Sequence, residues 1–246
     1  MENAGYIALS RQMSLTREMD VIANNLANVT TPAFKGQTVR FQEYLDRAKD
    51  GTKLSYVQDA AMPRDWSEGP LTSTGNPLDV AIHGDGFFVV NTPNGTRYTR
   101  KGHFEMDANR QLVSADGAPI QGDGGPISVP QDAIDVTVAE DGTVSVKQPG
   151  SPQTTTIGKL RVVNFTDPQA LQEEAAGLYS AAPQVTATPV ANAHLVQGAL
   201  EQSNVQPIIE LTHMMSVSRN YDAAQQLVQS EHDRIRKAIT GIVGGA

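Results

Sequence analysis

The strongest apolar periodicity lies at the two ends of the chain. Between residues 205 and 242 apolar side chains recur every seven residues. A second set of apolar residues lies three positions C-terminal to members of the first set. Between residues 6 and 29 they recur at steps of three and four. A stripe of this kind keeps one edge of a helix turned toward a partner helix. The pattern predicts one helix over residues 6–29 and a longer one over residues 205–242.

These stripes define a predicted assembly seam. Neither helix has an apolar surface in its own sequence neighbourhood to cover its stripe, so the simplest arrangement pairs the two ends of the chain as a coiled coil. The seam residues of the first helix are Leu9, Met13, Met19, Ile22, Leu26 and Val29, and those of the second are Met214, Val217, Tyr221, Val228, Ile235 and Ile242.

Three asparagines, Asn24, Asn25 and Asn28, crowd the end of the first helix, and Pro32 follows shortly after it. Proline disfavours helical geometry in the residue before it, so the helix is expected to stop here. Asparagine amides compete for backbone hydrogen bonds and weaken a helix. The amides therefore either belong to a solvated helix end or are buried groups that set register and partner.

The central residues have a different, β-like pattern. Residues 32–71 read as a connector with short strands or irregular elements, in which Asp50-Gly51 could form a hairpin turn. From residue 72 to residue 190 short apolar runs alternate with turns such as Asn94-Gly95, Asp116-Gly117 and Asp141-Gly142. These dipeptides suit the positive φ angles of hairpin turns. Repeated hairpins predict an all-β barrel or sandwich.

The expected fold is therefore α+β. The sequence predicts an N-terminal coiled-coil helix over residues 1–31, the connector over 32–71, the β-rich domain over 72–190, and a C-terminal coiled-coil helix over 191–246. The β domain would be inserted between the two pairing helices. Trp66, at the end of the connector, suits either a packed anchor at a domain edge or an interface aromatic.

Composition narrows the class of function. The chain has 246 residues, no cysteine, a formal net charge of −8 and a pI near 5.1. The acidic balance argues against nucleic-acid binding, which needs Lys and Arg to neutralise phosphates. No segment approaches the apolar length of a membrane span, and charged residues interrupt any signal-peptide core near the N-terminus. We expect no membrane insertion and no cleaved leader.

The sequence contains few residues in arrangements typical of catalysis or metal binding. Five histidines are scattered without metal-ligand spacing, and Gly84-Asp85-Gly86 lacks the spacing and the strand-to-helix context of a phosphate loop. Nucleophile and calcium-loop motifs are absent from the sequence. We expect no catalytic residue, no metal, no cofactor and no small-molecule substrate. A chain without a recognisable catalytic or metal-binding motif is better suited to assembly than to catalysis.

Four ordered stretches carry a family resemblance. They are residues 22–36 (IANNLANVTTPAFKG), residues 74–82 with 84–88 (TGNPLDVAI and GDGFF), residues 98–104 (YTRKGHF) and residues 197–205 (QGALEQSNV). Together they resemble the flagellar axial proteins, which are the rod and hook subunits. The residues of the N-terminal signature are Asn24, Asn25, Leu26, Asn28, Pro32 and Phe34.

The resemblance implies a structural subunit of the bacterial flagellar basal-body rod within the periplasm. Its implied partners are copies of itself, neighbouring rod proteins and the flagellar type III export apparatus. The length and the opening residues resemble a proximal-rod member, and a distal-rod protein is the alternative. Distal-rod relatives tend to carry Asn-Gly where this chain has Pro32-Ala33, which weakens that alternative.

Two further functions come from other classes. The β-rich domain could recognise cell-wall glycan while the helices oligomerise it, or the chain could hydrolyse peptidoglycan. The sequence offers no nucleophile or metal site for hydrolysis. The structural subunit remains the leading hypothesis.

Overall fold

The computed structural model describes residues 2–47, 53–150 and 153–243. Within these ranges it describes all side chains except those of residues 2–7, 41–47, 53–61, 235, 238–239 and 241–243. The chain forms two compact units. Unit 1 comprises residues 1–29, 36–65 and 205–246, and unit 2 comprises residues 30–35 and 66–204. The predicted hairpin turn at Asp50-Gly51 lies outside the described residues.

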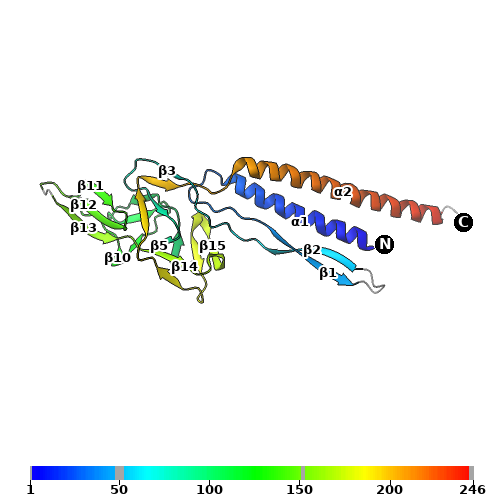
Figure 1. The fold of residues 1–246 in the computed structure, drawn as a ribbon, viewed down its shortest axis with the longest axis horizontal. Coiled ribbons are helices and arrows are strands. Elements are labelled where there is room, and N and C mark those ends of the chain that lie inside the picture. Colours follow the sequence, from blue (N-terminus) through cyan, green and yellow to red (C-terminus); the bar gives the residue numbers. More distant parts are fainter. Residues whose placement is uncertain (1, 48–52, 151–152, 244–246) are drawn as a thin grey trace. The chain divides into compact units, whose positions relative to one another are not determined.

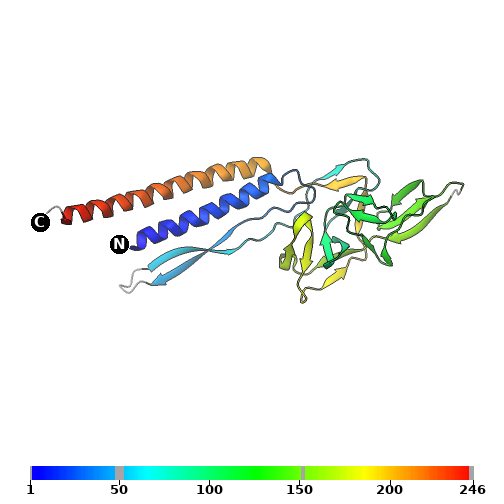
Figure 2. The same ribbon diagram turned by 180° about the vertical axis from the view of Figure 1, so that it is seen from behind.

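Unit 1 contains the two terminal helices, α1 (Glu2–Ala27) and α2 (Pro207–Val243). They lie side by side and antiparallel in both views (Figures 1 and 2). A small apolar cluster joins them, in which Leu15 and Ile22 of α1 pack with Val217 and Ala224 of α2. Both helices were predicted from periodicity. Helix α1 ends two residues earlier than expected, and α2 begins at Pro207, where a missing N–H costs little.

A β-hairpin completes unit 1. Strands β1 (Arg40–Arg47) and β2 (Lys53–Ala61) pair antiparallel, with Tyr44 opposite Tyr56. The hairpin contacts α1 through β2 (Figure 1). Two backbone hydrogen bonds extend its base, from Thr38 N–H to the Pro63 carbonyl and from Asp65 N–H to the Gly36 carbonyl. The connector predicted over residues 32–71 therefore contributes residues 36–65 to the unit of the helices.

Unit 2 is β-rich, as predicted. Its largest sheet has six strands that curl as a half barrel, in the order β15-β16-β6-β5-β14-β17. These strands are β5 (Phe87–Thr92), β6 (Gly95–Thr99), β14 (Val162–Phe165), β15 (Leu171–Glu173), β16 (Tyr179–Ala181) and β17 (Ala187–Pro189). A three-stranded sheet has the order β11 (Asp135–Val138), β12 (Thr143–Lys147) and β13 (Thr154–Lys159). Two short 3₁₀ turns, Pro168–Ala170 and Ala175–Gly177, flank β15.

Smaller strand pairs complete unit 2. Strand β7 (Phe104–Met106) pairs with β8 (Leu112–Ser114), and β9 (Gln121–Gly122) pairs with β10 (Gly125–Pro126). Strand β18 (His194–Gln197) pairs with β4 (Val80–His83), and β19 (Ala199–Glu201) pairs with β3 (Leu71–Ser73). Residues 194–201, which the sequence analysis assigned to the C-terminal segment, thus return to the start of the β region.

Strand β5 lies between the two cores of unit 2. Phe88 and Val90 face the larger core, while Phe87 and Val89 face a smaller one that contains Phe165 and Tyr179. Because successive strand side chains point to opposite faces, a strand buried on both faces needs an unbroken apolar run. This explains the uninterrupted sequence of residues 87–90.

Trp66 belongs to the smaller core of unit 2. Its ring makes edge-on contacts with Phe87 and Tyr179, at centroid distances of 5.3 and 5.1 Å. Edge-on geometry is favoured between aromatic rings. Of the two roles considered from sequence, the structure shows the packed anchor.

The hairpin turns lie where the glycine dipeptides predicted them. Gly95, Gly117 and Gly142 have φ angles of 103°, 77° and 88°. Gly95 is the first residue of β6, directly after the turn from β5, and Gly142 lies in the turn between β11 and β12. L-residues with a side chain rarely adopt these angles, so glycine is required here.

Candidate functional site

The predicted seam residues have different environments in the structure. Ile22 and Val217 are buried between the helices, and Met19, Met214 and Tyr221 pack at the edge of the same cluster. Leu26, Val29 and Val228 are half-buried. Leu9 and Met13 are exposed, with 48% and 58% of their surface accessible. The side chains of Ile235 and Ile242 lie outside the described residues. Leu15 and Ala224, which the seam prediction did not include, belong to the contact.

The three asparagines of the signature have different environments. Asn24 is exposed, and Asn28 donates its amide to the Asn24 carbonyl at 3.0 Å. Asn25 is only 2% exposed, and its side chain makes two hydrogen bonds with the backbone of Gln37, at 2.8 and 2.9 Å. One asparagine is therefore a buried amide, which ties the end of α1 to the chain that leads into β1.

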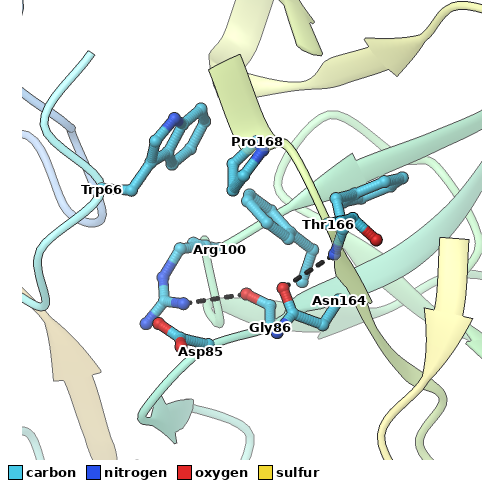
Figure 3. A pocket seen from close by; sticks show the side chains of 9 residues that line it. Trp66, Asp85, Gly86, Arg100, Asn164, Thr166 and Pro168 are labelled. Atoms are coloured by element: carbon cyan, nitrogen blue, oxygen red, sulfur yellow. Dashed lines mark hydrogen bonds between the residues drawn. The ribbon is translucent and has the colours of Figure 1, made fainter. Parts of the chain in front are cut away.

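A cavity of about 240 Å³ lies in unit 2 beside Trp66 (Figure 3). Asp85 and Arg100 are the ionisable residues among those that line it, and the Arg100 guanidinium donates to the Gly86 carbonyl. The cavity is smaller than the roughly 300–1,000 Å³ typical of ligand pockets. A guanidinium does not deprotonate, so Arg100 cannot accept a proton from Asp85 or act as a general base. The cavity offers no acid–base pair.

Arg100 also belongs to a buried ion cluster, which consists of Lys35, Arg100 and Glu201. Lys35, Glu201 and Arg100 are 0%, 2% and 4% exposed. Glu201 accepts from Lys35 Nζ at 2.6 Å through one carboxylate oxygen, and from Arg100 Nε at 2.8 Å through the other. The backbone N–H of Gly69 adds a third bond to the carboxylate at 3.0 Å.

Backbone carbonyls satisfy the remaining donors that the structure shows. Lys35 Nζ donates to the Ser67 carbonyl at 2.5 Å, and the two terminal nitrogens of Arg100 donate to the carbonyls of Gly84 and Gly86, each at 2.9 Å. A charge this deeply buried is tolerated only when it is paired and hydrogen-bonded. The buried ion cluster meets that requirement at each of its three members.

A second carboxylate lies close to this cluster. Burial acts to raise the pKa of Glu68, but a hydrogen bond shared with His83 and one from the Gly84 N–H outweigh that effect, and Arg100 contributes further. The pKa of Glu68 therefore lies below its ordinary value of 4.5. Glu68 is ionised at neutral pH.

The buried ion cluster was not predicted from the sequence. Its signal was nevertheless present, because each member lies in a different stretch of the family resemblance. Lys35 belongs to residues 22–36, Arg100 to residues 98–104 and Glu201 to residues 197–205, while Gly84 and Gly86 belong to residues 84–88. The four stretches that are distant in sequence thus meet at one place in unit 2.

Titratable groups elsewhere form pairs. Four histidines each lie next to a carboxylate, in the pairs His83 with Glu68, His103 with Asp79, His194 with Glu140, and His213 with Glu18. Within the described residues, no three His, Cys, Asp or Glu side chains are grouped so as to hold a metal ion. The described helices also include no stretch that is both long and apolar enough to cross a membrane.

Three family models of known proteins match parts of this chain. Residues 6–35 match the family model for flagella basal body rod proteins, residues 81–146 match the flagellar hook protein FlgE/F/G D1 domain, and residues 196–240 match the flagellar basal body rod FlgEFG protein C-terminal model. A flagellar basal-body rod protein FlgF from Caulobacter vibrioides is 37% identical over 97% of both chains.

The chain belongs to the flagellar basal-body rod protein family. The FlgF of Escherichia coli is 32% identical over 97% of both chains. A FlgG from Buchnera aphidicola is 33% identical over 89% of this chain and 92% of its own. The rod protein described here is accordingly a non-enzymatic structural subunit of the flagellar basal body, and it assembles with other rod proteins.

Proposed function

We propose that this chain is a subunit of the proximal part of the rod, within the periplasm. The observation that carries the proposal is the pattern of similarity. FlgF relatives match the chain nearly from end to end, at up to 37% identity, whereas FlgG relatives match at 32–33% over 86–89% of it. The length and the Pro32-Ala33 departure support the same assignment.

The terminal helices form the assembly seam in this proposal. Each helix would bury its apolar stripe against the opposite terminus and against neighbouring subunits as a coiled coil. Exposed Leu9 and Met13 on α1, and Ile208, Leu211 and Met215 on α2, are apolar surface available to neighbours. Filament growth requires contacts that are heterologous and do not close into a ring. The subunit would reach this place through the type III export apparatus, without a cleaved leader.

The seam is tested by substituting two residues that occupy the same heptad position in successive heptads of α2. The double variant Met214→Asp with Tyr221→Asp places two carboxylates in the apolar cluster between the helices, where unpaired charge is costly. We expect loss of incorporation into rods while unit 2 stays folded. Ser218→Asp with Gln225→Asp is the matched control, because both residues are exposed at the same seven-residue spacing. Normal incorporation of the first variant would refute the seam.

The proximal position is tested separately. In a strain that lacks the distal-rod protein, truncated rods should still contain this chain if it is proximal. If the chain is found only in rods that also contain the distal-rod protein, the alternative assignment to the distal rod is correct.

A further inference from the structure

The buried ion cluster lies where the chain leaves unit 2. The chain passes between the two units four times, after residues 29, 35, 65 and 204. Lys35 is the last residue before one of these crossings, Ser67 and Gly69 follow closely on another, and Glu201 shortly precedes the last. The cluster thus joins every segment of unit 2 that continues into unit 1.

Further hydrogen bonds from backbone and side-chain groups link the same three segments. Ala33 N–H donates to the Glu201 carbonyl at 2.9 Å, and Asn204 N–H donates to the Phe34 carbonyl at 3.3 Å. The Asn204 side chain donates to the carbonyl and the hydroxyl of Ser67, at 3.1 and 3.2 Å. The segments around residues 34, 68 and 202 therefore hold one another in pairs, and the ion cluster lies among them.

Arg100 ties this group of segments to the core. It links Glu201 to the carbonyls of Gly84 and Gly86, in the turn between β4 and β5. Strands β4 and β5 carry several of the most deeply buried residues of unit 2, including Val80, Ile82, Phe88 and Val90. A displacement of any crossing segment would have to break bonds that end at this rigid part of the unit.

Charged side chains are unusual at a buried position such as this cluster. An apolar cluster of equal volume is often as stable as a buried ion pair, so stability alone does not explain the three charged side chains. Charge-assisted bonds are directional, however, and they fix the geometry of the groups they join. Buried pairs are also screened little by salt. These properties suit a fixed joint better than a general contribution to folding.

We propose that the Lys35–Arg100–Glu201 cluster is the mechanical anchor of the subunit, at which force carried along the chain from the terminal helices enters the β-rich unit. This inference rests on the proposed role as a rod subunit, in which load must pass from one subunit to the next. The bonds at the anchor act in parallel on three crossing segments, so no single segment bears the load alone.

The local part of the proposal is tested by amide exchange on the purified full chain. Lys35→Met keeps the unbranched side chain and removes the ammonium group, and Glu201→Gln keeps the shape and removes the charge. We expect exchange at residues 30–35, 66–70 and 199–204 to accelerate about tenfold or more, while strands β4, β5 and β14 change little. Lys101→Met, a half-buried lysine of the same motif outside the cluster, is the matched control and should match wild type.

Two exchange results would overturn the anchor. Unchanged exchange in the crossing segments would show that the cluster does not hold them. Equal acceleration throughout unit 2 would show that the cluster supports folding in general.

Swimming under load tests the mechanical part. In a strain lacking the gene, wild-type chain should restore swimming in dilute and in viscous medium. Lys35→Met should be incorporated into rods and support swimming in dilute medium, with the fraction of motile cells falling several-fold at high viscosity. Equal motility of this variant and wild type under load would overturn the anchor. Failure of the wild-type chain itself to restore swimming would instead contradict the proposed function.

Discussion

Gly102 lies where two backbone segments of unit 2 approach each other closely. Its carbonyl accepts from the Val80 N–H at 2.9 Å, and a Cβ atom at this position would be 1.6 Å from the Val80 carbonyl oxygen. Real structures do not contain such a contact, and backbone on both sides cannot move aside cheaply. The glycine of the stretch YTRKGHF is therefore a steric requirement of the fold.

We expect Gly102→Ala to lower the free energy of unfolding of unit 2 by about 3 kcal/mol or more, because overpacking forces backbone shifts. Denaturant unfolding measures this change. Gly124→Ala is the matched control, because nothing lies within 4 Å of its Cβ position and its φ angle is ordinary. It should be neutral or stabilising by up to about 1 kcal/mol. Equal effects of the two variants would contradict the close approach.

Glu68 predicts a pH dependence of stability. Its pKa in the folded protein lies below the ordinary value of 4.5, so its contribution is fully present above about pH 4.5 and is lost as the pH falls through the lowered pKa. Glu68→Gln should reduce the change in unfolding free energy over this acidic window and leave its slope above pH 5 unaltered. His83→Ala, which removes the strongest interaction that lowers the pKa, should act in the same direction.

Unfolding curves recorded at steps between pH 3 and 6 would check the prediction for Glu68. A wild-type protein and a Glu68→Gln variant with the same acidic slope would show that the carboxylate gains nothing from folding.

Single residues were harder to predict from the sequence than their neighbourhoods. Three amides were expected near the end of the first helix, but burial of Asn25 in preference to Asn24 depends on the position of Gln37, which lies in another segment. Lys35, Arg100 and Glu201 meet only in the folded chain, because they are far apart in sequence. The available signals were the place of each residue in a stretch of the family resemblance and, for Lys35, a single charge among the apolar and glycine neighbours of residues 33–36.

At the scale of elements, Asn25 joins α1 to the hairpin of unit 1. Its side chain replaces the hydrogen bonds that the backbone of Gln37 would otherwise make to water. We expect Asn25→Ala to destabilise this junction by about 1–3 kcal/mol, the cost of leaving partly buried backbone groups unpaired. Amide exchange at Gln37 measures the effect directly.

Asn24→Ala is the control for this junction. Asn24 occupies the same turn of α1 but is exposed, so its substitution should change stability by no more than about 0.5 kcal/mol. If Gln37 exchanges at the wild-type rate in Asn25→Ala, the junction is held by other contacts.

Elements with strong periodicity or turn chemistry were predicted well. Both helices and the hairpin turns at Gly95, Gly117 and Gly142 follow from local sequence. Strands β18 and β19 were not predicted, because they are three to four residues long and pair with β4 and β3, which lie more than a hundred residues earlier. Pairing over such a distance leaves little local signal. The apolar run of residues 87–90 indicated a buried strand, but the sequence did not show that it separates two cores.

At the scale of the molecule, the stretches that carry the family resemblance coincide with the contacts that connect its elements. The chain holds two units with separate cores, and the four stretches that carry the family resemblance supply both the junction at Asn25 and the ion cluster at Glu201. The stretches that carry the resemblance therefore include residues that connect elements. A structural subunit depends on such connections in the way that an enzyme depends on its catalytic groups.

The central claim is that this chain is a structural subunit of the basal-body rod. Mass spectrometry of purified hook–basal bodies, before and after the outer rings and the hook are stripped, tests it most directly. We expect the chain to stay with the bare rod as an integral component. Absence of the chain from every axial fraction would show that it is not a rod subunit.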